Sequence, residues 1–121
     1  MNDDLHLDVA ADDAVTTVAV HGELDLATVG SLMAGIESDV LGRAANPVVL
    51  DLAGCGFIDS TGARTIVQVG RRVEAEGRRF SIVSPPESGA RFTLALLGVA
   101  DSFPVHDALG PAVADLSGRA G

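Results

Sequence analysis

The chain has 121 residues, a formal net charge of −9 and a single cysteine, Cys55. This length predicts one domain, residues 1–121, and the 47% hydrophobic content with only 3% aromatic residues predicts an aliphatic core. The negative charge argues against nucleic acid or an anionic membrane surface as a partner. One cysteine allows no intramolecular disulfide and excludes a cysteine-based metal site.

No stretch of the sequence is a candidate for crossing a membrane or for directing export. No apolar run approaches the ~18 residues that a membrane span needs, and residues 1–4 are acidic rather than signal-like. We therefore expect a soluble, cytoplasmic protein without a membrane partner.

Hydrophobic periodicity predicts alternating strands and helices. In chain order we expect strands at 5–10 and 15–20, a helix at 26–42, a strand from 47, a helix at about 61–76, a strand at 79–84, a helix from 85 to about 98, an edge strand at 103–105 and a helix at 107–116. Asp25 or Thr28 is expected to cap the first helix. The fold class is therefore α/β: a mostly parallel sheet of about five strands, with an N-terminal hairpin and about four helices.

The segment 47–62 is the most informative part of the chain, because Ser60 falls where a buried strand ends and a helix begins. Ligands and reacting groups of α/β sheets usually lie at such ends. One interpretation makes Ser60 an N-cap that only satisfies a free helix amide. The other makes it a phosphorylation site, since a helix N-terminus stabilises an added phosphate and Gly62 allows close backbone approach.

Enzymatic and nucleotide-binding interpretations fit the residues less well. A serine hydrolase centred on Ser60 would need glycine where Ile58 stands, and His106 is the only histidine downstream. In a dinucleotide loop that begins at Gly54, the third glycine position falls on Asp59. The chain has no lysine, which excludes a Walker loop and also a phosphoacceptor role for Asp51, which we expect at a strand end or turn.

The remaining polar residues give weaker signals. His6, His21 and His106 follow no metal-ligand spacing, so no metal site is expected. The arginine pairs at 71–72 and 78–79 flank a helix end, where cations complement the C-terminal carbonyl groups. A small basic patch for an acidic partner is the alternative interpretation.

Four segments in this order and spacing give the chain a family resemblance. They are Gly-Glu-Leu-Asp at 22–25, Val-Val-Leu-Asp-Leu at 48–52, Phe-Ile-Asp-Ser-Thr-Gly at 57–62 and Leu-Gly-Val-Ala-Asp at 97–101. Over nearly its whole length the chain resembles a STAS domain, specifically a stand-alone bacterial anti-sigma factor antagonist.

The resemblance implies a partner switch rather than an enzyme. The serine at the position of Ser60 is phosphorylated in this family by a cognate anti-sigma factor, a serine kinase that uses ATP. The unphosphorylated antagonist binds the anti-sigma factor and releases the sigma factor, and a PP2C-type phosphatase resets the phosphorylated form. We expect no cofactor, and a monomer or weak dimer.

The resemblance also implies which residues meet the partner. Asp25, Asp59, Ser60, Thr61 and Gly62 match the family pattern and are expected to form the contact surface with the next two residues. Those two are Ala63 and Arg64. The family usually has Leu or Ile directly after the glycine, and this departure bears on the choice of partner. The alternative is a non-switching STAS scaffold or subunit of a stress-sensing assembly or of a lipid or anion transporter, and a serine hydrolase is a more distant one.

Overall fold

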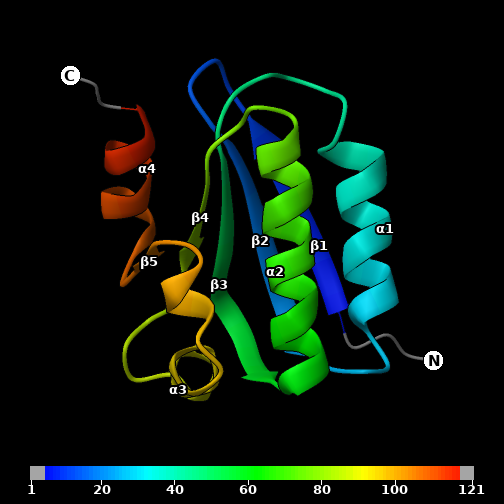
Figure 1. The fold of residues 1–121 in the computed structure, drawn as a ribbon, viewed down its shortest axis with the longest axis vertical. Helices are drawn as coiled ribbons and strands as arrows, with labels where there is room; N and C mark the ends of the chain where they lie inside the picture. The colour runs from blue at the N-terminus through cyan, green and yellow to red at the C-terminus, as the bar shows by residue number, and fades with distance from the viewer. Residues whose placement is uncertain (1–4, 118–121) are drawn as a thin grey trace.

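The computed structural model describes residues 5–117, which form a five-stranded sheet with helices packed on both faces (Figure 1). The strands are β1 (Leu5–Ala11), β2 (Thr16–Leu24), β3 (Val48–Ile58), β4 (Phe80–Val83) and β5 (Val105–His106). The helices are α1 (Val29–Asp39), α2 (Ser60–Ala75), α3 (Gly89–Leu96) and α4 (Leu109–Ser117), with a short 3-10 helix η1 (Val99–Asp101) after α3.

The strands lie in the sheet in their sequence order, β1-β2-β3-β4-β5. β1 and β2 form the antiparallel N-terminal hairpin, and β2, β3, β4 and β5 are parallel to one another. The predicted fold class is confirmed: a mostly parallel sheet with an N-terminal hairpin and four α-helices. All carboxyl ends of the parallel strands therefore point to the end of the molecule where α2 begins (Figure 1).

The two faces of the sheet carry separate apolar clusters, because successive strand residues point to opposite sides. The larger cluster joins the strands to α1 and α2 and includes Leu50, Ile36 and Ile66, all fully buried. The smaller one packs α4 through Ala112 and Leu116 against strand residues of the opposite face. The core is aliphatic, as the composition predicts.

β3 is longer than the sequence pattern indicates. It continues through Gly54 and Gly56 because the ladder with β2 persists there, with register shifts that mark a bulge in the pairing. Asp51, expected at a strand end or turn, lies inside β3 opposite Ala19 of β2. The extension carries the chain to the start of α2.

The first turns of two helices differ from the prediction. α3 begins at Gly89 rather than at the prolines, because Ser88 caps it: its hydroxyl accepts a hydrogen bond from the Arg91 amide at 3.0 Å. α1 begins after Thr28, which occupies the N-cap position without a side-chain capping bond. Residues 26–28, expected to be helical, form a turn instead.

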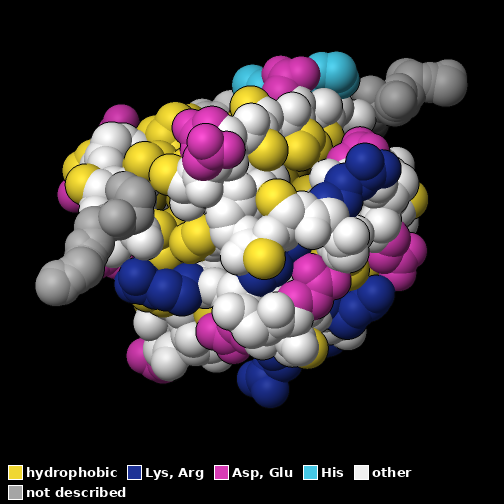
Figure 2. All heavy atoms as spheres, turned by 90° about the horizontal axis from the view of Figure 1, so that it is seen from above, with side chains coloured by type: hydrophobic (Ala, Val, Ile, Leu, Met, Phe, Trp, Pro, Cys, Tyr) yellow, Lys and Arg dark blue, Asp and Glu magenta, His cyan; other side chains and the backbone are white. Residues whose placement is uncertain are grey.

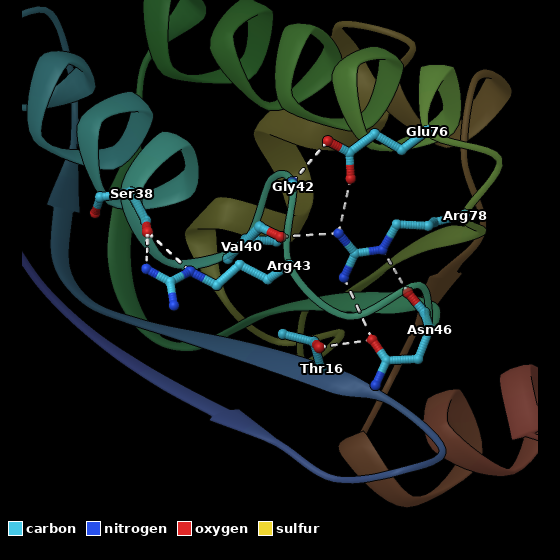
Figure 3. Close-up of polar contacts among 8 residues, drawn as sticks. All are labelled: Thr16, Ser38, Val40, Gly42, Arg43, Asn46, Glu76 and Arg78. Atoms are coloured by element: carbon cyan, nitrogen blue, oxygen red, sulfur yellow. Dashed lines mark hydrogen bonds and ion pairs between the residues drawn. The ribbon is translucent and has the colours of Figure 1, made fainter.

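A buried arginine network lies at the end of the sheet opposite to the start of α2 (Figure 3). Arg78 is only 4% exposed, and its guanidinium donates to the carbonyl oxygens of Asn46 at 2.6 Å and Val40 at 2.8 Å. The guanidinium also forms an ion pair of 3.0 Å with one carboxylate oxygen of Glu76. The second oxygen of Glu76 accepts a hydrogen bond from the Gly42 amide. Acidic and basic side chains are interspersed over the face of the molecule seen in Figure 2.

Candidate functional site

Ser60 is the first residue of α2, and its side chain is not used by the fold. The cap of α2 is Asp59, whose Oδ1 accepts a hydrogen bond from the Gly62 amide at 2.8 Å. The exposed hydroxyl of Ser60 makes no hydrogen bond within residues 5–117. The N-cap interpretation of Ser60 is therefore wrong, because the carboxylate one residue earlier performs that task.

Asp59 also ties the start of α2 to the loop between β2 and α1. Its Oδ2 accepts from the Leu26 amide at 3.3 Å, and its own amide donates to the Leu24 carbonyl oxygen at 3.2 Å. Two segments that are 33 residues apart in the sequence are thereby held beside Ser60. Asp59 thus fixes the geometry of the junction.

The loop that carries Asp25 is held by local hydrogen bonds. The Asp25 carboxylate accepts from the Ala27 amide at 2.9 Å, and the Asp25 amide donates to the hydroxyl of Thr28 at 3.0 Å. The same hydroxyl donates to the Glu23 carbonyl oxygen at 2.8 Å. Asp25 therefore lies in an ordered turn whose next residue, Leu26, is hydrogen-bonded to Asp59 at the start of α2.

Gly62 allows the first turn of α2 to lie directly on the end of β2. A Cβ at this position would be 2.4 Å from the backbone oxygen of Leu24 and 3.1 Å from a methyl group of Ile58. No side chain fits there without a backbone shift. Thr61 beside it is half-buried, and its carbonyl oxygen accepts from the Thr65 hydroxyl at 2.9 Å.

A pocket of about 290 Å³ opens beside Ser60, between α2 and the segment that follows α3. Its lining residues are Ser60, Ala63, Arg64, Val67, Leu97 and Val99. Ala63 is only 2% exposed and belongs to the core, so the small side chain at this position leaves the pocket open. The side chain of Arg64 is exposed and makes no hydrogen bond or ion pair to any described residue.

Three large apolar side chains near Ser60 are exposed, and we call them the apolar rim: Leu26 at 74%, Phe57 at 48% and Leu97 at 47%. Leu26 is bonded through its amide to Asp59, Phe57 lies three residues before Ser60, and Leu97 lines the same pocket. All three belong to segments that border the start of α2, and exposed apolar side chains of this size are typical of protein-binding surfaces.

Sequence reasoning missed the apolar rim, and only part of it left a signal. The helix expected from 85 to about 98 carries four large apolar residues, Phe92, Leu94, Leu96 and Leu97. Residues two apart are about 200° apart around a helix, so these four cannot share one face. The structure buries Leu94 and leaves Phe92 and Leu96 each 69% exposed on α3. No comparable signal marks Leu26 or Phe57.

Other chemistry-bearing side chains lie outside this site. His6 and His21 flank Asp8 on the hairpin, and their Nε2 atoms lie 3.0 and 3.3 Å from the oxygens of its carboxylate. No group of His, Cys, Asp and Glu within residues 5–117 has the arrangement to hold a metal ion. Burial raises the pKa of the Cys55 thiol, which therefore stays protonated at neutral pH.

A comparison with family models decides the family. The model of the STAS domain matches residues 6–112, from the first strand into the last helix. The chain belongs to the STAS family. Among the described residues of this STAS chain, no helix has both the length and the apolar character that crossing a membrane requires.

Solved structures with the same fold include proteins of different function. The crystal structure of an anti-sigma factor antagonist from Mycobacterium paratuberculosis is 25% identical, covers 93% of both chains and has a TM-score of 0.81. The anti-sigma factor antagonist SpoIIAA in its unphosphorylated form is 19% identical over 91% of this chain and 93% of its own, with a TM-score of 0.70. The murine anion transporter Slc26a9 is 17% identical over 86% of this chain and 18% of its own, with a TM-score of 0.70.

The STAS fold therefore brings six of the seven predicted site residues, which are consecutive in the sequence, to one end of the molecule. The seventh, Asp25, lies in the neighbouring turn. The polar groups of Ser60, Asp59 and Arg64 lie at the surface or at the strand–helix junction. Gly62 and Ala63 are buried, and their small size determines the shape of the site. Within residues 5–117 no histidine is hydrogen-bonded to Ser60, as the hydrolase alternative would need, and the Nε2 of His106 lies 3.7 Å from the Asp115 carboxylate of α4.

Proposed function

We propose that this STAS chain is an anti-sigma factor antagonist, which binds a kinase-type anti-sigma factor and is switched off by phosphorylation at Ser60. The observation that carries the proposal is the unused hydroxyl of Ser60. It is exposed at the first residue of α2, makes no hydrogen bond within residues 5–117, and lies beside the apolar rim. The name of the Mycobacterium paratuberculosis protein supports the same function.

The apolar rim supplies the attraction in the unphosphorylated form. Covering Leu26, Phe57 and Leu97 removes apolar surface from water, at roughly 25 cal/mol for each Å² buried. Ser60 is then enclosed at the interface, with the turn at Asp25 on one side and the pocket on the other. An uncharged hydroxyl is tolerated there, because it can hydrogen-bond to the partner or to water.

Phosphorylation reverses the balance. The γ-phosphoryl group of ATP leaves ADP, a bond forms between phosphorus and the Ser60 Oγ, and the hydroxyl proton passes to a base of the partner. The product carries about −1.5 to −2 charges at neutral pH. In the complex this charge must be desolvated close to the carboxylates of Asp59 and Asp25, and each ~1.4 kcal/mol of that cost weakens binding tenfold.

The remaining residues shape the site rather than react. Asp59 and Gly62 fix the start of α2, Asp25 and Thr61 border the serine, and Ala63 and Arg64 line the pocket beside it. In this proposal the chain has no catalytic residue and no cofactor. ATP belongs to the anti-sigma factor, and a PP2C-type phosphatase removes the phosphate.

The proposal is tested by incubating the protein with each kinase-type anti-sigma factor of its organism and ATP, and mapping the phosphate by mass spectrometry. We expect a single phosphate, on Ser60. Ser60→Ala should receive none, while Thr61→Val, the matched control, should be phosphorylated as the wild type is. Phosphate on Thr61, or binding without phosphorylation by every partner, would exclude the switch and favour a scaffold or transporter subunit.

A further inference from the structure

The pocket beside Ser60 contains one charged side chain, that of Arg64. Of the arginines in residues 5–117, Arg43, Arg72, Arg78, Arg79 and Arg91 make hydrogen bonds or ion pairs. Arg64 makes none, so nothing in the described fold holds its guanidinium in place. An unpaired cation, the guanidinium of Arg64, therefore lies next to the unpaired hydroxyl of Ser60.

Helix geometry places these two side chains on the same face of α2. Ser60 and Arg64 are four residues apart, which brings their Cβ atoms to about 5–6 Å. An anion that precedes a cation by four residues is the favourable orientation of such a pair. Both side chains line the same pocket, so the space between them is open.

We propose that phosphorylation of Ser60 draws Arg64 into an ion pair with the phosphate across the mouth of this pocket. The modification then changes two features at once: it adds a dianion and removes a cation that is free in the unmodified protein. This inference rests on the proposed function of Ser60 and adds a mechanism of regulation at the same site. Guanidinium groups suit the task, because they bind phosphate oxygens through two parallel hydrogen bonds.

Among the charged side chains around Ser60, Arg64 is the cation that can bind the phosphate. Asp59 precedes Ser60 directly and Asp25 lies in the turn tied to it, and carboxylates repel a phosphate; the oxygens of Asp59 already accept from two backbone amides. Asp101 of η1 belongs to the segment that closes the pocket but does not line it. Arg71 is also without a partner among the described residues, but it lines a different groove, between α1 and α2.

The test uses protein in which phosphoserine is installed genetically at position 60, so that no kinase is needed. The pKa of the phosphate is measured by phosphorus NMR in the wild-type background, in Arg64→Gln and in Arg71→Gln. We expect the pKa of the phosphate to rise by about 0.5 in Arg64→Gln, since the nearby cation favours the dianion. Arg71→Gln should leave the pKa unchanged, and Arg64→Lys should restore part of the lowering.

Equal phosphate pKa values in the wild-type background and in Arg64→Gln would overturn the inference. The helix N-terminus and both carboxylates are present in each variant, so their contributions cancel in the comparison. Failure of the proposed function gives a different result: no anti-sigma factor phosphorylates Ser60, while the phosphate pKa still responds to Arg64.

Discussion

At the start of α2, Asp59 caps the helix, and the hydroxyl of Ser60 takes no part in capping. The carboxylate of Asp59 caps the helix and bonds the neighbouring loop, so the serine hydroxyl is released from structural work. Replacing Ser60 with alanine should therefore abolish phosphorylation while leaving the free energy of unfolding nearly constant. This separation makes Ser60 variants clean probes of function.

Gly62 shows how a residue without a side chain shapes the same junction. We expect Gly62→Ala to lower the free energy of unfolding by about 2 kcal/mol, because its Cβ would meet the Leu24 backbone oxygen at 2.4 Å. The matched control is Gly30→Ala in α1, where nothing lies within 4 Å of the added carbon. That variant should gain about 0.5 kcal/mol. Urea unfolding measures both, and equal effects would refute the packing argument.

At the scale of elements, Arg78 joins the end of α1, the α1–β3 loop and the turn before β4 (Figure 3). Its position after α2 indicated a cation for the C-terminus of that helix. In the structure Arg78 binds the C-terminus of α1 instead, through the carbonyl oxygen of the C-cap residue Val40. A local rule identified the interaction type but not the partner, because the partner is 38 residues away.

Removing the Arg78 guanidinium should be costly. We expect Arg78→Met to lower the free energy of unfolding by about 3 kcal/mol, because two carbonyl groups and the Glu76 carboxylate lose their partner. The exposed neighbour Arg79 pairs with Asp115 at 3.7 Å, and Arg79→Gln should cost about 0.5 kcal/mol or less. Chemical denaturation of the two variants checks the contrast; similar losses would contradict the role of Arg78.

Elements with strong local signals could be predicted from the sequence, and those decided by distant contacts could not. Gly77 ends α2 as predicted, with a φ of +78° that favours glycine. The length of β3 depends on pairing with β2, and the start of α3 on the cap by Ser88, so both were misplaced. At the site, the motif located Ser60, whereas the exposure of Leu26 in the β2–α1 turn and of Phe57 in β3 depends on how distant segments pack.

At the scale of the whole molecule, Cys55 reports on the integrity of the core. Burial raises the pKa of its thiol above the ordinary value of 9.0, so the unfolded chain ionises before the folded one. The contribution of Cys55 to stability is therefore complete below pH 9.0 and is lost as the pH rises through the raised value. We expect the stability difference between the wild type and Cys55→Ala to narrow from pH 7 to alkaline pH, measured by urea unfolding. A constant difference would contradict this assignment.

The partner switch is the central claim, and one binding measurement tests it most directly. The affinity for the phosphorylating anti-sigma factor is measured by calorimetry for the wild type, for Ser60→Ala and for protein with phosphoserine at position 60. We predict equal affinities for the first two, and a loss of about a hundredfold or more for the phosphorylated form, since ~1.4 kcal/mol corresponds to each tenfold change. If all three forms bind with the same affinity, the charge at Ser60 does not control the complex and the account is wrong.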